Sequence, residues 1–363
     1  MDYAEKIKEL EEELRKTPYN KATQHHIGLV KAKIAKLREK ALARGSGGGK
    51  GQSYAVRKSG DASCVLVGFP SVGKSTLLNA LTNAESETAA YAFTTLDVIP
   101  GLMEYENAQI QILDVPGILE GAAIGKGRGR EVLSVVRSAD LVIFLADATA
   151  PSTVEVLRKE INDSGLRVNE ERPDVKITKK ARGGINLGTT VRLSKMSIPT
   201  IISILREFRI NNADVVLRTD VSPDQLIDAI EGNRLYVPGI TVLTKSDLVS
   251  DLEVRAASKK VKADIAISAS AGKNIDKLQK LIYKKLGLIR IYCKEVSKEA
   301  DLKEPLILNK DASVRDACLK LHKDFVSGFR FVRIWGSSAK FPGQRLSLKH
   351  RLKDKDIIEI HVR

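Results

Sequence analysis

The strongest chemical signal in the sequence is a nine-residue loop, GFPSVGKST, at positions 68–76. Its spacing matches the phosphate-binding pattern GxxxxGK followed by Ser or Thr, in which glycines let backbone N–H groups turn inward around phosphates. Lys74 would bridge the β- and γ-phosphates of a nucleotide, and the Ser75 hydroxyl would be a ligand of Mg²⁺. A strand-like run (62–67) precedes the loop and a helix-like run (76–81) follows it, which is the context the motif requires. The sequence therefore predicts a nucleoside triphosphate site.

Two further segments could complete the site around the γ-phosphate. DVPG at 114–117 ends a strand-like run, so the Asp114 carboxylate can hold Mg²⁺ through water and the Gly117 N–H can reach the phosphate. FTTLD at 93–97 offers a second hydroxyl ligand for the ion. Thr95 is our choice over Thr94, although the spacing does not decide between them and a plain polar loop is the alternative.

Specificity for the base is predicted by two short motifs nearer the C-terminus. TKSD at 244–247 follows a strand-like run, and the Asp247 carboxylate there could accept hydrogen bonds from N1–H and the 2-amino group of guanine. Adenine presents no such donors, so a fixed acceptor would reject it. SAS at 268–270 ends the next strand-like run, and backbone N–H groups of Ser268 and Ala269 would close over the base. In this order behind the phosphate loop, these motifs predict GTP binding.

The elements that must position these residues follow from short apolar runs. The runs end in glycine, aspartate or serine and are separated by helical patterns, which favours a parallel α/β sheet. They lie at 62–67, 110–113, 141–146, 240–243 and 265–267. Parallel strands bring their carboxyl ends, and the motifs that follow them, to one edge of the sheet.

The first 44 residues predict a pair of amphipathic helices. Apolar residues recur at helical spacing, and Thr17 followed by Pro18 could serve as the N-cap and the first position of the second helix. The apolar positions are Ile7, Leu10, Leu14, Ile27, Val30, Ile34 and Leu37. Packing on the protein's own body and binding of a partner are both open for these faces.

Composition restricts the partners and the compartment. The chain of 363 residues has 60 Lys and Arg against 45 Asp and Glu, a net charge of +15. Residues 52–156 have 7 basic against 12 acidic side chains, whereas residues 1–51 have 12 against 7 and residues 288–363 have 17 against 10. This excess predicts a polyanionic partner such as RNA, with an ordinary lysine-rich surface as the alternative. Three widely spaced cysteines and no apolar run near 18 residues favour a cytoplasmic protein without a membrane segment.

At this point the motifs resemble a known family. GFPSVGKST, FTTLD, DVPG, TKSD and SAS resemble the G motifs of Obg-related GTPases, and DVPGILEGAAIGKGRGR at 114–130 is similar to the developmentally regulated GTP-binding protein (DRG) family. An archaeal member is favoured. The resemblance implies an α/β fold, with a P-loop GTPase core and parallel-type sheet at 51–156 and 237–287. It also implies a helical hairpin and Gly-rich linker at 1–50, an inserted ribosomal-protein-like α+β domain at 157–236 and a C-terminal β-grasp TGS domain at 288–363.

The resemblance also implies roles for the matching positions. Lys74, Thr95 and Gly117 would be the catalytic groups, and Ser75 and Thr95 would hold Mg²⁺ directly, with Asp114 acting through water. The nucleotide site would comprise Gly68, Phe69, Pro70, Ser71, Val72, Gly73, Lys74, Ser75, Thr76, Phe93, Thr94, Thr95, Leu96, Asp97, Asp114, Val115, Pro116, Gly117, Thr244, Lys245, Ser246, Asp247, Ser268, Ala269 and Ser270. Thr244 departs from the usual Asn, and it lacks the amide that braces the P-loop and the base.

Catalysis is expected to be slow in the isolated protein. Ile118 follows DVPG where Ras-like enzymes place a water-orienting glutamine, so we expect acceleration by a protein activator, an RNA surface or a monovalent cation. Use of K⁺ stays open, because Ser71 stands where related potassium-dependent GTPases have Asn. The glycine-rich segment 121–130 could order around GTP as a switch loop. Its Lys126, Arg128 and Arg130 could supply transition-state charge or, as favoured here, form a solvated face or partner contact.

The appendages carry a weaker signal for RNA. Residues 175–191 suggest a hairpin around Gly183 and Gly184, and capped helices are predicted at 200–208 and from Ser222. The basic residues Lys179, Lys180 and Arg182 could meet RNA phosphates or belong to an ordinary turn.

The last 75 or so residues predict strands at 289–293, 306–308, 331–335 and 357–362 and a helix at 313–322. Aromatic residues interleaved with basic ones can stack on bases, but a domain this small should need most of its aromatics as core. The residues concerned are Phe329, Phe331, Trp335 and Phe341, among Arg330, Arg333, Lys340 and Arg345.

Together these observations predict a GTPase that acts as a GTP-controlled factor in translation. GTP and GDP would be its ligands, and the ribosome or its RNA would bind through the TGS region, the insert and the N-terminal helices. One rival is a nucleotide-gated RNA-binding scaffold. The other is an Obg-like ATPase, against which TKSD argues.

Overall fold

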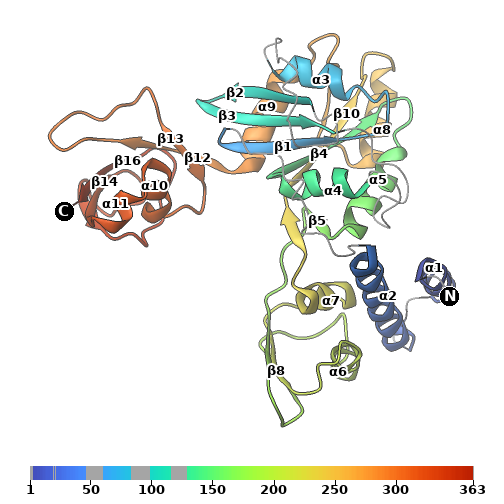
Figure 1. Cartoon of the computed structure of the whole chain (residues 1–363). Helices are drawn as coiled ribbons and strands as arrows, with labels where there is room; N and C mark the ends of the chain where they lie inside the picture. The colour runs from blue at the N-terminus through green and yellow to red at the C-terminus, as the bar shows by residue number, and fades with distance from the viewer. Residues whose placement is uncertain are drawn as a thin grey trace. The chain divides into compact units, whose positions relative to one another are not determined.

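The computed structural model describes residues 3–18, 20, 22–45, 60–82, 99–115 and 129–362. The chain divides into two compact units. One contains residues 158–237 with the N-terminal helices, and the other contains the central sheet with the C-terminal region. Each unit is described by itself below (Figure 1).

The central sheet has the parallel topology that the apolar runs predict. Its order is β11-β10-β4-β1-β3-β2, and all neighbours are parallel except β2 and β3. The strands are β1 (Ala62–Val67), β2 (Ile99–Tyr105), β3 (Ala108–Asp114), β4 (Leu141–Asp147), β10 (Gly239–Thr244) and β11 (Ile265–Ala266). Every residue of β1 and β10 is buried, because helices cover both faces of the sheet.

Helices on opposite faces of this sheet bury its two sets of alternating side chains. α3 (Lys74–Leu81) and α9 (Ile275–Leu286) pack on one face, where Leu77, Leu278 and Ile282 join a core with Cys64 and Ile112. α4 (Gly129–Ser138) and α5 (Thr153–Asp163) lie on the other side in Figure 1. α8 (Asp251–Val261) lies beside β10 and β11. The carboxyl ends of β1, β3, β4, β10 and β11 therefore meet at one edge.

The edge strand β2 was not predicted from the sequence. Pro100 lies within it, and proline lowers the expectation of a strand because it cannot donate to a ladder. β2 tolerates it as an edge strand, and the turn at Glu106 and Asn107, with φ of 51° and 63°, joins it to β3. Gly101 permits close packing here, because a Cβ at that position would lie 2.5 Å from the Thr82 side chain.

The N-terminal helices pack as an antiparallel-type pair with the apolar faces that their spacing predicts. α1 (Tyr3–Lys16) and α2 (Gln24–Gly45) bury Ile7, Val30 and Ile34 between them. The predicted start of the second helix at Thr17 and Pro18 is wrong. The Thr17 hydroxyl donates to the Glu13 carbonyl, and reciprocal hydrogen bonds of 2.9 and 3.0 Å between Asn20 and Thr23 set the start of α2 instead.

The other face of α2 packs against the insert. Ala32 and Ala35 join a core made by α6 (Ile198–Glu207), α7 (Pro223–Glu231) and the strands β6 (Val175–Lys179), β7 (Ile185–Thr189) and β8 (Ala213–Leu217). The N-terminal pair thus packs on the protein's own body. Ser197 caps α6, and Ser222 with Gln225 forms a capping box on α7, as the sequence predicts.

The predicted hairpin at 175–191 is wrong. β6 and β7 do not pair with each other, because β8 lies between them, antiparallel to β6 and parallel to β7. Gly183 and Gly184, with φ of 107° and 71°, bend the chain as expected, but the connection crosses over the central strand. Two short parallel strands, β5 (Leu166–Val168) and β9 (Leu235–Val237), form where the insert leaves and returns.

The C-terminal region is a five-stranded sheet with helices on one face. The order is β13-β12-β16-β14-β15, built from β12 (Leu288–Cys293), β13 (Leu306–Asn309), β14 (Phe329–Trp335), β15 (Gln344–Leu346) and β16 (Asp356–Val362). The helices are α10 (Val314–Leu321), which Ser313 and Asp316 cap, and α11 (Asp324–Ser327).

The expectation that most aromatic residues of this region serve as core is wrong. Of the four, Phe329 packs against the core, whereas Phe331 and Trp335 lie half-buried at alternate positions of β14 and Phe341 is 59% exposed.

Within the described part of the chain, no helix has both the length and the apolar character needed to cross a membrane.

Candidate nucleotide-binding site

The loop at 68–73 has a backbone shape that its residue types explain. Gly68 follows β1, and a Cβ there would lie 2.6 Å from the Val72 side chain, so no larger residue fits without a shift. Ser71 and Gly73 have φ of 62° and 95°, the left-handed region that favours glycine. Gly73 is the N-cap of α3, so the loop leads directly into the positive end of a helix.

Lys74 and Ser75, the first two residues of α3, place a cation and a hydroxyl beside the end of β3. Lys74 Nζ donates to the carbonyls of Gly68 and Phe69, each at 3.1 Å, and the Ser75 hydroxyl donates to Asp114 Oδ2 at 2.8 Å. Burial raises the pKa of Asp114, and the Ser75 hydrogen bond and the Lys74 charge only partly offset it. Burial likewise lowers the pKa of Lys74 against the pull of Asp114. The charged forms of Lys74 and Asp114 are therefore both disfavoured by burial, and a bound ligand of opposite charge would stabilise each of them.

The donor set at this point suits a hard cation. The Ser75 hydroxyl and the Asp114 carboxylate are oxygen ligands of the kind that Mg²⁺ takes, together with substrate phosphates and water. Their 2.8 Å contact brings the two predicted protein ligands together. In the described part of the chain there is no cluster of three or more His, Cys, Asp or Glu side chains that could hold a metal by itself. Among the histidines, His25 lies 3.3 Å from the Thr200 hydroxyl and His26 lies 2.8 Å from the Glu13 carboxylate.

Thr244 makes a side-chain contact with the P-loop backbone that the sequence did not predict. Its hydroxyl, buried at the end of β10, lies 2.8 Å from the Val72 carbonyl and 3.2 Å from the Ala146 carbonyl. Thr244 lacks the amide of the usual Asn, but its hydroxyl reaches the backbone of the P-loop directly. The same contact ties β10 to the end of β4.

The predicted guanine-recognition motifs lie side by side. The Ser246 N–H donates to the Ile267 carbonyl at 3.1 Å, which joins the two loops behind β10 and β11. Asp247 is exposed, and a hydrogen bond from the Ser268 side chain is the main reason that its pKa is lowered. The Ser268 side chain is buried and also lies 3.1 Å from the Ser270 hydroxyl. An ionised, oriented Asp247 carboxylate is the acceptor that a guanine edge needs.

One contact at this edge was missed by sequence reasoning. Lys245 Nζ lies 2.6 Å from Asp147 Oδ2, at the end of β4. Burial alone would raise the pKa of Asp147, but hydrogen bonds from Lys245 and Thr149 outweigh it, so the pKa is lowered. Lys245 is held with φ of 56°. The available signal was position, since Asp147 ends an apolar run just as Asp114 does.

The structure does not describe every residue of the predicted site. Phe93, Thr94, Thr95, Leu96, Asp97, Pro116 and Gly117 lie outside the described residues, as do Ile118 and positions 121–128. The remaining predicted positions all lie at or after the carboxyl ends of β1, β3, β10 and β11. Parallel topology thus brings the P-loop, Asp114, TKSD and SAS to one edge, and this arrangement defines a P-loop GTP-binding protein of the GTPase class.

Three family models together match the chain from residue 63 to residue 362. Residues 63–180 match the family model described as 50S ribosome-binding GTPase, and residues 182–288 match the C-terminal region of the same domain. Residues 289–362 match the TGS domain.

Among curated proteins, an uncharacterised GTP-binding protein of Methanocaldococcus jannaschii is 53% identical over all of this chain and 94% of its own length. Human developmentally regulated GTP-binding protein 2 is 43% identical over 99% of both chains. Among solved structures, the YchF GTPase of Schizosaccharomyces pombe is 14% identical, covers 84% of this chain and 99% of its own, and has a TM-score of 0.47. The two full-length relatives show that the chain belongs to the developmentally regulated GTP-binding protein family.

Proposed function

We propose that the protein hydrolyses GTP to GDP and phosphate with Mg²⁺ and that its nucleotide state controls association with RNA or the ribosome during translation. The observation that carries the hydrolytic part is the contact between Ser75 of the P-loop and Asp114 at the end of β3. It joins the phosphate loop to the segment that would respond to the γ-phosphate. Relatives named for GTP binding, and a family model named for ribosome binding, support the two parts separately.

The chain's own residues have distinct tasks in this proposal. Lys74 leaves the carbonyls of Gly68 and Phe69 and binds the β- and γ-phosphates, while Ser75 would hold Mg²⁺ directly and Asp114 would hold it through water. Mg²⁺ held by these residues would supply positive charge to the phosphate oxygens. Thr95, as a further ligand of Mg²⁺, and Gly117, as a contact of the γ-phosphate, complete the set of residues that we propose for the site. No glutamine follows DVPG, so hydrolysis is slow until an activator orients the attacking water.

Base specificity is tested by the Asp247→Asn variant. Removing a charged acceptor from a hydrogen-bonded pair weakens GTP binding by about 1.5–3 kcal/mol, or roughly 10- to 150-fold. The Asp251→Asn variant is the matched control, because Asp251 is an exposed carboxylate four positions along in the first turn of α8. Competition of GTP and ATP for a fluorescent nucleotide measures both effects. Equal affinity of the wild-type protein for the two nucleotides would overturn the role of Asp247 and favour an ATPase.

Hydrolysis and partner control need separate measurements. Single-turnover assays of the purified protein should show slow, Mg²⁺-dependent release of phosphate, and no hydrolysis would reject the enzymatic proposal. Rapid hydrolysis without any activator would reject the role assigned to Ile118.

Co-sedimentation with ribosomal subunits should differ between GDP and a non-hydrolysable GTP analogue. Equal co-sedimentation of the protein with ribosomal subunits in both nucleotides would reject control of the association by GTP. Salt-sensitive RNA binding without any rate stimulation would instead favour a scaffold.

A further inference from the structure

The C-terminal sheet has one face that the domain's own helices do not cover. Val314 and Cys318 of α10 and Phe325 of α11 pack with Val332 and Ile334 of β14 on the other face. Side chains alternate along a strand, so Phe331, Arg333 and Trp335 point away from that core. Cross-strand pairing extends the same face to other strands, through the pairs Phe331 with His361, Arg333 with Glu359 and Arg345, and Trp335 with Ile357. We call these seven side chains, with Lys294 and with Arg330, whose guanidinium lies 5.8 Å from the Phe331 ring centroid, the open TGS face.

Aromatic rings on this face are already arranged for stacking. The rings of Phe331 and His361 are stacked, with centroids 4.3 Å apart and planes at 20°. The Arg345 guanidinium lies 4.6 Å from the Phe331 ring centroid, and Lys294 Nζ lies 4.5 Å from the Trp335 ring. Phe331 and Trp335 are four residues apart on one strand, roughly 13 Å at 3.3 Å per residue. Two aromatic rings on one strand, Phe331 and Trp335, therefore each have a cation over the ring, and the stack of Phe331 extends to His361.

The charge of the open TGS face favours an anionic ligand. Glu359 is the acidic member of the set, and its side chain is only 3% exposed. It contacts Lys294 at 3.0 Å, His361 at 2.7 Å and Arg333 at 3.7 Å, so its charge is compensated from within. Arg330 and Arg345 are exposed. The buried Glu359 carboxylate thus orients Lys294, His361 and Arg333, and the charge that the open TGS face exposes to solvent is positive.

We propose that the open TGS face binds single-stranded RNA, with unpaired bases stacking at Phe331, His361 and Trp335 and phosphates held by Arg330, Arg333 and Arg345. Stacking on aromatic rings and on guanidinium planes requires bases that are free of a duplex, because paired bases are hidden in the helix. This inference rests on the RNA association proposed above and names the form of RNA and the surface that receives it. A surface recognising duplex shape would need phosphate contacts without exposed rings.

Trp335 provides an internal reporter for the first experiment. It is the only tryptophan of the chain, so intrinsic tryptophan fluorescence reports this face alone. An oligoadenylate of about twelve nucleotides, within the usual site size of a stacking surface, should quench the emission in a saturable way. A self-complementary RNA duplex of the same length should bind at least about tenfold more weakly. No quenching by the single strand, or equal binding of the duplex, would overturn the proposal.

Two variants with a matched control separate stacking from charge. Phe331→Leu keeps apolar bulk but removes the ring, and it should weaken oligoadenylate binding roughly 5- to 150-fold. Arg345→Gln should lower the slope of log affinity against log salt by about 0.7, the value for one phosphate contact on a single strand. Arg315→Gln removes the same charge from α10 on the covered side of the sheet and should leave both quantities unchanged. Anisotropy of a labelled oligoadenylate is the readout, because it does not depend on Trp335.

The outcome can be separated from that of the proposed function. Phe331 lies outside the nucleotide-binding residues, so Phe331→Leu should keep the wild-type rate of GTP hydrolysis without RNA and the wild-type melting temperature within a few degrees. If both variants bind oligoadenylate like the wild type while ribosome association persists, the open TGS face is not the RNA site, and the proposed function stands. Since stacking is common to RNA and DNA, single-stranded DNA is a further arm. DNA binding at least tenfold tighter than RNA would overturn the assignment to RNA.

Discussion

Asp114 is held in surroundings that favour its protonated form. Burial raises its pKa, and neither the Ser75 hydrogen bond nor the Lys74 charge restores the ordinary value. A carboxyl group whose pKa is higher in the folded than in the unfolded chain reduces stability as the pH rises, because the unfolded chain releases its proton first. The nucleotide-free fold therefore loses stability, as the pH rises, through the carboxylate that we propose as a ligand of Mg²⁺ through water.

The Asp114→Asn variant should separate these two effects. At neutral pH the nucleotide-free variant should melt at a higher temperature than the wild type, because it has no charge to bury there. The difference should shrink on acidification, as Asp114 of the wild type becomes protonated. Binding of GTP should become weaker in Mg²⁺ but change little in EDTA, which fluorescent nucleotide titrations measure. A lower melting temperature of the variant at neutral pH would contradict this account.

Thr244 makes a second prediction at the scale of single residues. Thr244→Val removes the hydroxyl that lies 2.8 Å from the Val72 carbonyl and leaves buried carbonyls without this donor. The cost is about 1–3 kcal/mol of unfolding free energy, with weaker GTP binding because the P-loop loses its brace. Thr244→Ser keeps the hydroxyl and is the matched control in denaturant unfolding. A Val variant as stable as the Ser variant would show that the contact contributes nothing.

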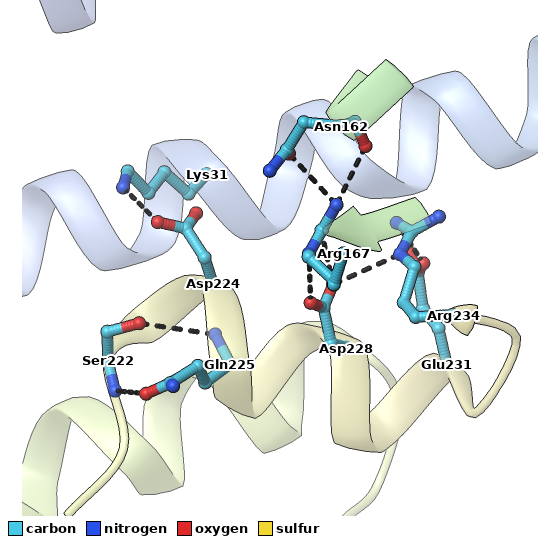
Figure 2. A network of polar contacts seen from close by, with 9 residues as sticks. All are labelled: Lys31, Asn162, Arg167, Ser222, Asp224, Gln225, Asp228, Glu231 and Arg234. Atoms are coloured by element: carbon cyan, nitrogen blue, oxygen red, sulfur yellow. Dashed lines mark hydrogen bonds and ion pairs between the residues drawn. The ribbon is translucent and has the colours of Figure 1, made fainter. Parts of the chain in front are cut away.

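At the scale of elements, one buried ion-pair network joins α5, β5 and α7 (Figure 2). Arg167 donates to both carboxylate oxygens of Asp228 at 2.6 and 2.7 Å and to the Asn162 carbonyl at 2.7 Å. Arg234 approaches the same carboxylate at 3.0 Å. The side chains of Arg167 and Asp228 are 9% and 2% exposed, so little water reaches the pair. The Arg167 guanidinium therefore ties α7 of the insert to the end of α5.

Breaking this network should be costly. Asp228→Asn leaves two guanidinium groups without their common anion and should lower the unfolding free energy by about 3–5 kcal/mol, as for other buried pairs that lose one partner. Asp214→Asn, which breaks the exposed pair with Lys180, is the matched control and should have little effect. Urea unfolding followed by circular dichroism would measure both. Equal effects of the two variants would show that burial does not govern the strength of the network.

Elements defined by local chemistry were predictable from the sequence. The P-loop, the caps at Ser197 and Ser222, and the strands that precede each motif are encoded within a few neighbouring residues. The pairing of both β6 and β7 with β8 was not predictable, because β8 is a strand more than twenty residues further along. β2 was not predicted because it contains Pro100. A strand tolerates proline when it lies at the edge of a sheet, and the sequence does not show which strand lies there.

The site was predictable in type, with less certainty about its supporting contacts. Parallel topology follows from the order of apolar runs, so the meeting of Ser75 with Asp114 could be expected. Two supporting contacts were not predictable: the Thr244 hydroxyl with the P-loop backbone, and Lys245 with Asp147. Both join side chains to groups on other strands or loops, and spacing along the sequence does not show such contacts.

At the scale of the whole molecule, the net charge of +15 is unevenly divided along the chain. Residues 52–156 are acidic, at 7 basic against 12 acidic side chains, whereas residues 288–363 have 17 against 10. A polyanion releases condensed counterions when it binds basic side chains, and a mononucleotide has no such layer. RNA affinity and GTP affinity should therefore respond differently to salt.

Titrations of the full chain at two salt concentrations test this difference. With about six phosphate contacts on a single strand, RNA affinity should fall roughly 300-fold between 50 and 200 mM salt, while GTP affinity in Mg²⁺ changes far less. Fluorescent GTP and labelled RNA can be followed in the same samples. Equal salt dependence of the two ligands would show that the basic excess plays no part in RNA binding.

The pairing of β4 with β10 also has a consequence for synthesis on the ribosome. β4 ends at Asp147 and its parallel partner begins at Gly239, so about ninety residues emerge before that edge can be closed. At about 5–20 residues per second, this is a delay of roughly 5–20 s during which the β4 edge has no partner. The insert has its own core, shared with Ala32 and Ala35 of the helix made earlier, and can fold during the interval. We therefore expect aggregation and chaperone binding to be greatest for nascent chains that pause while the insert is being made, because the β4 edge is then unpaired.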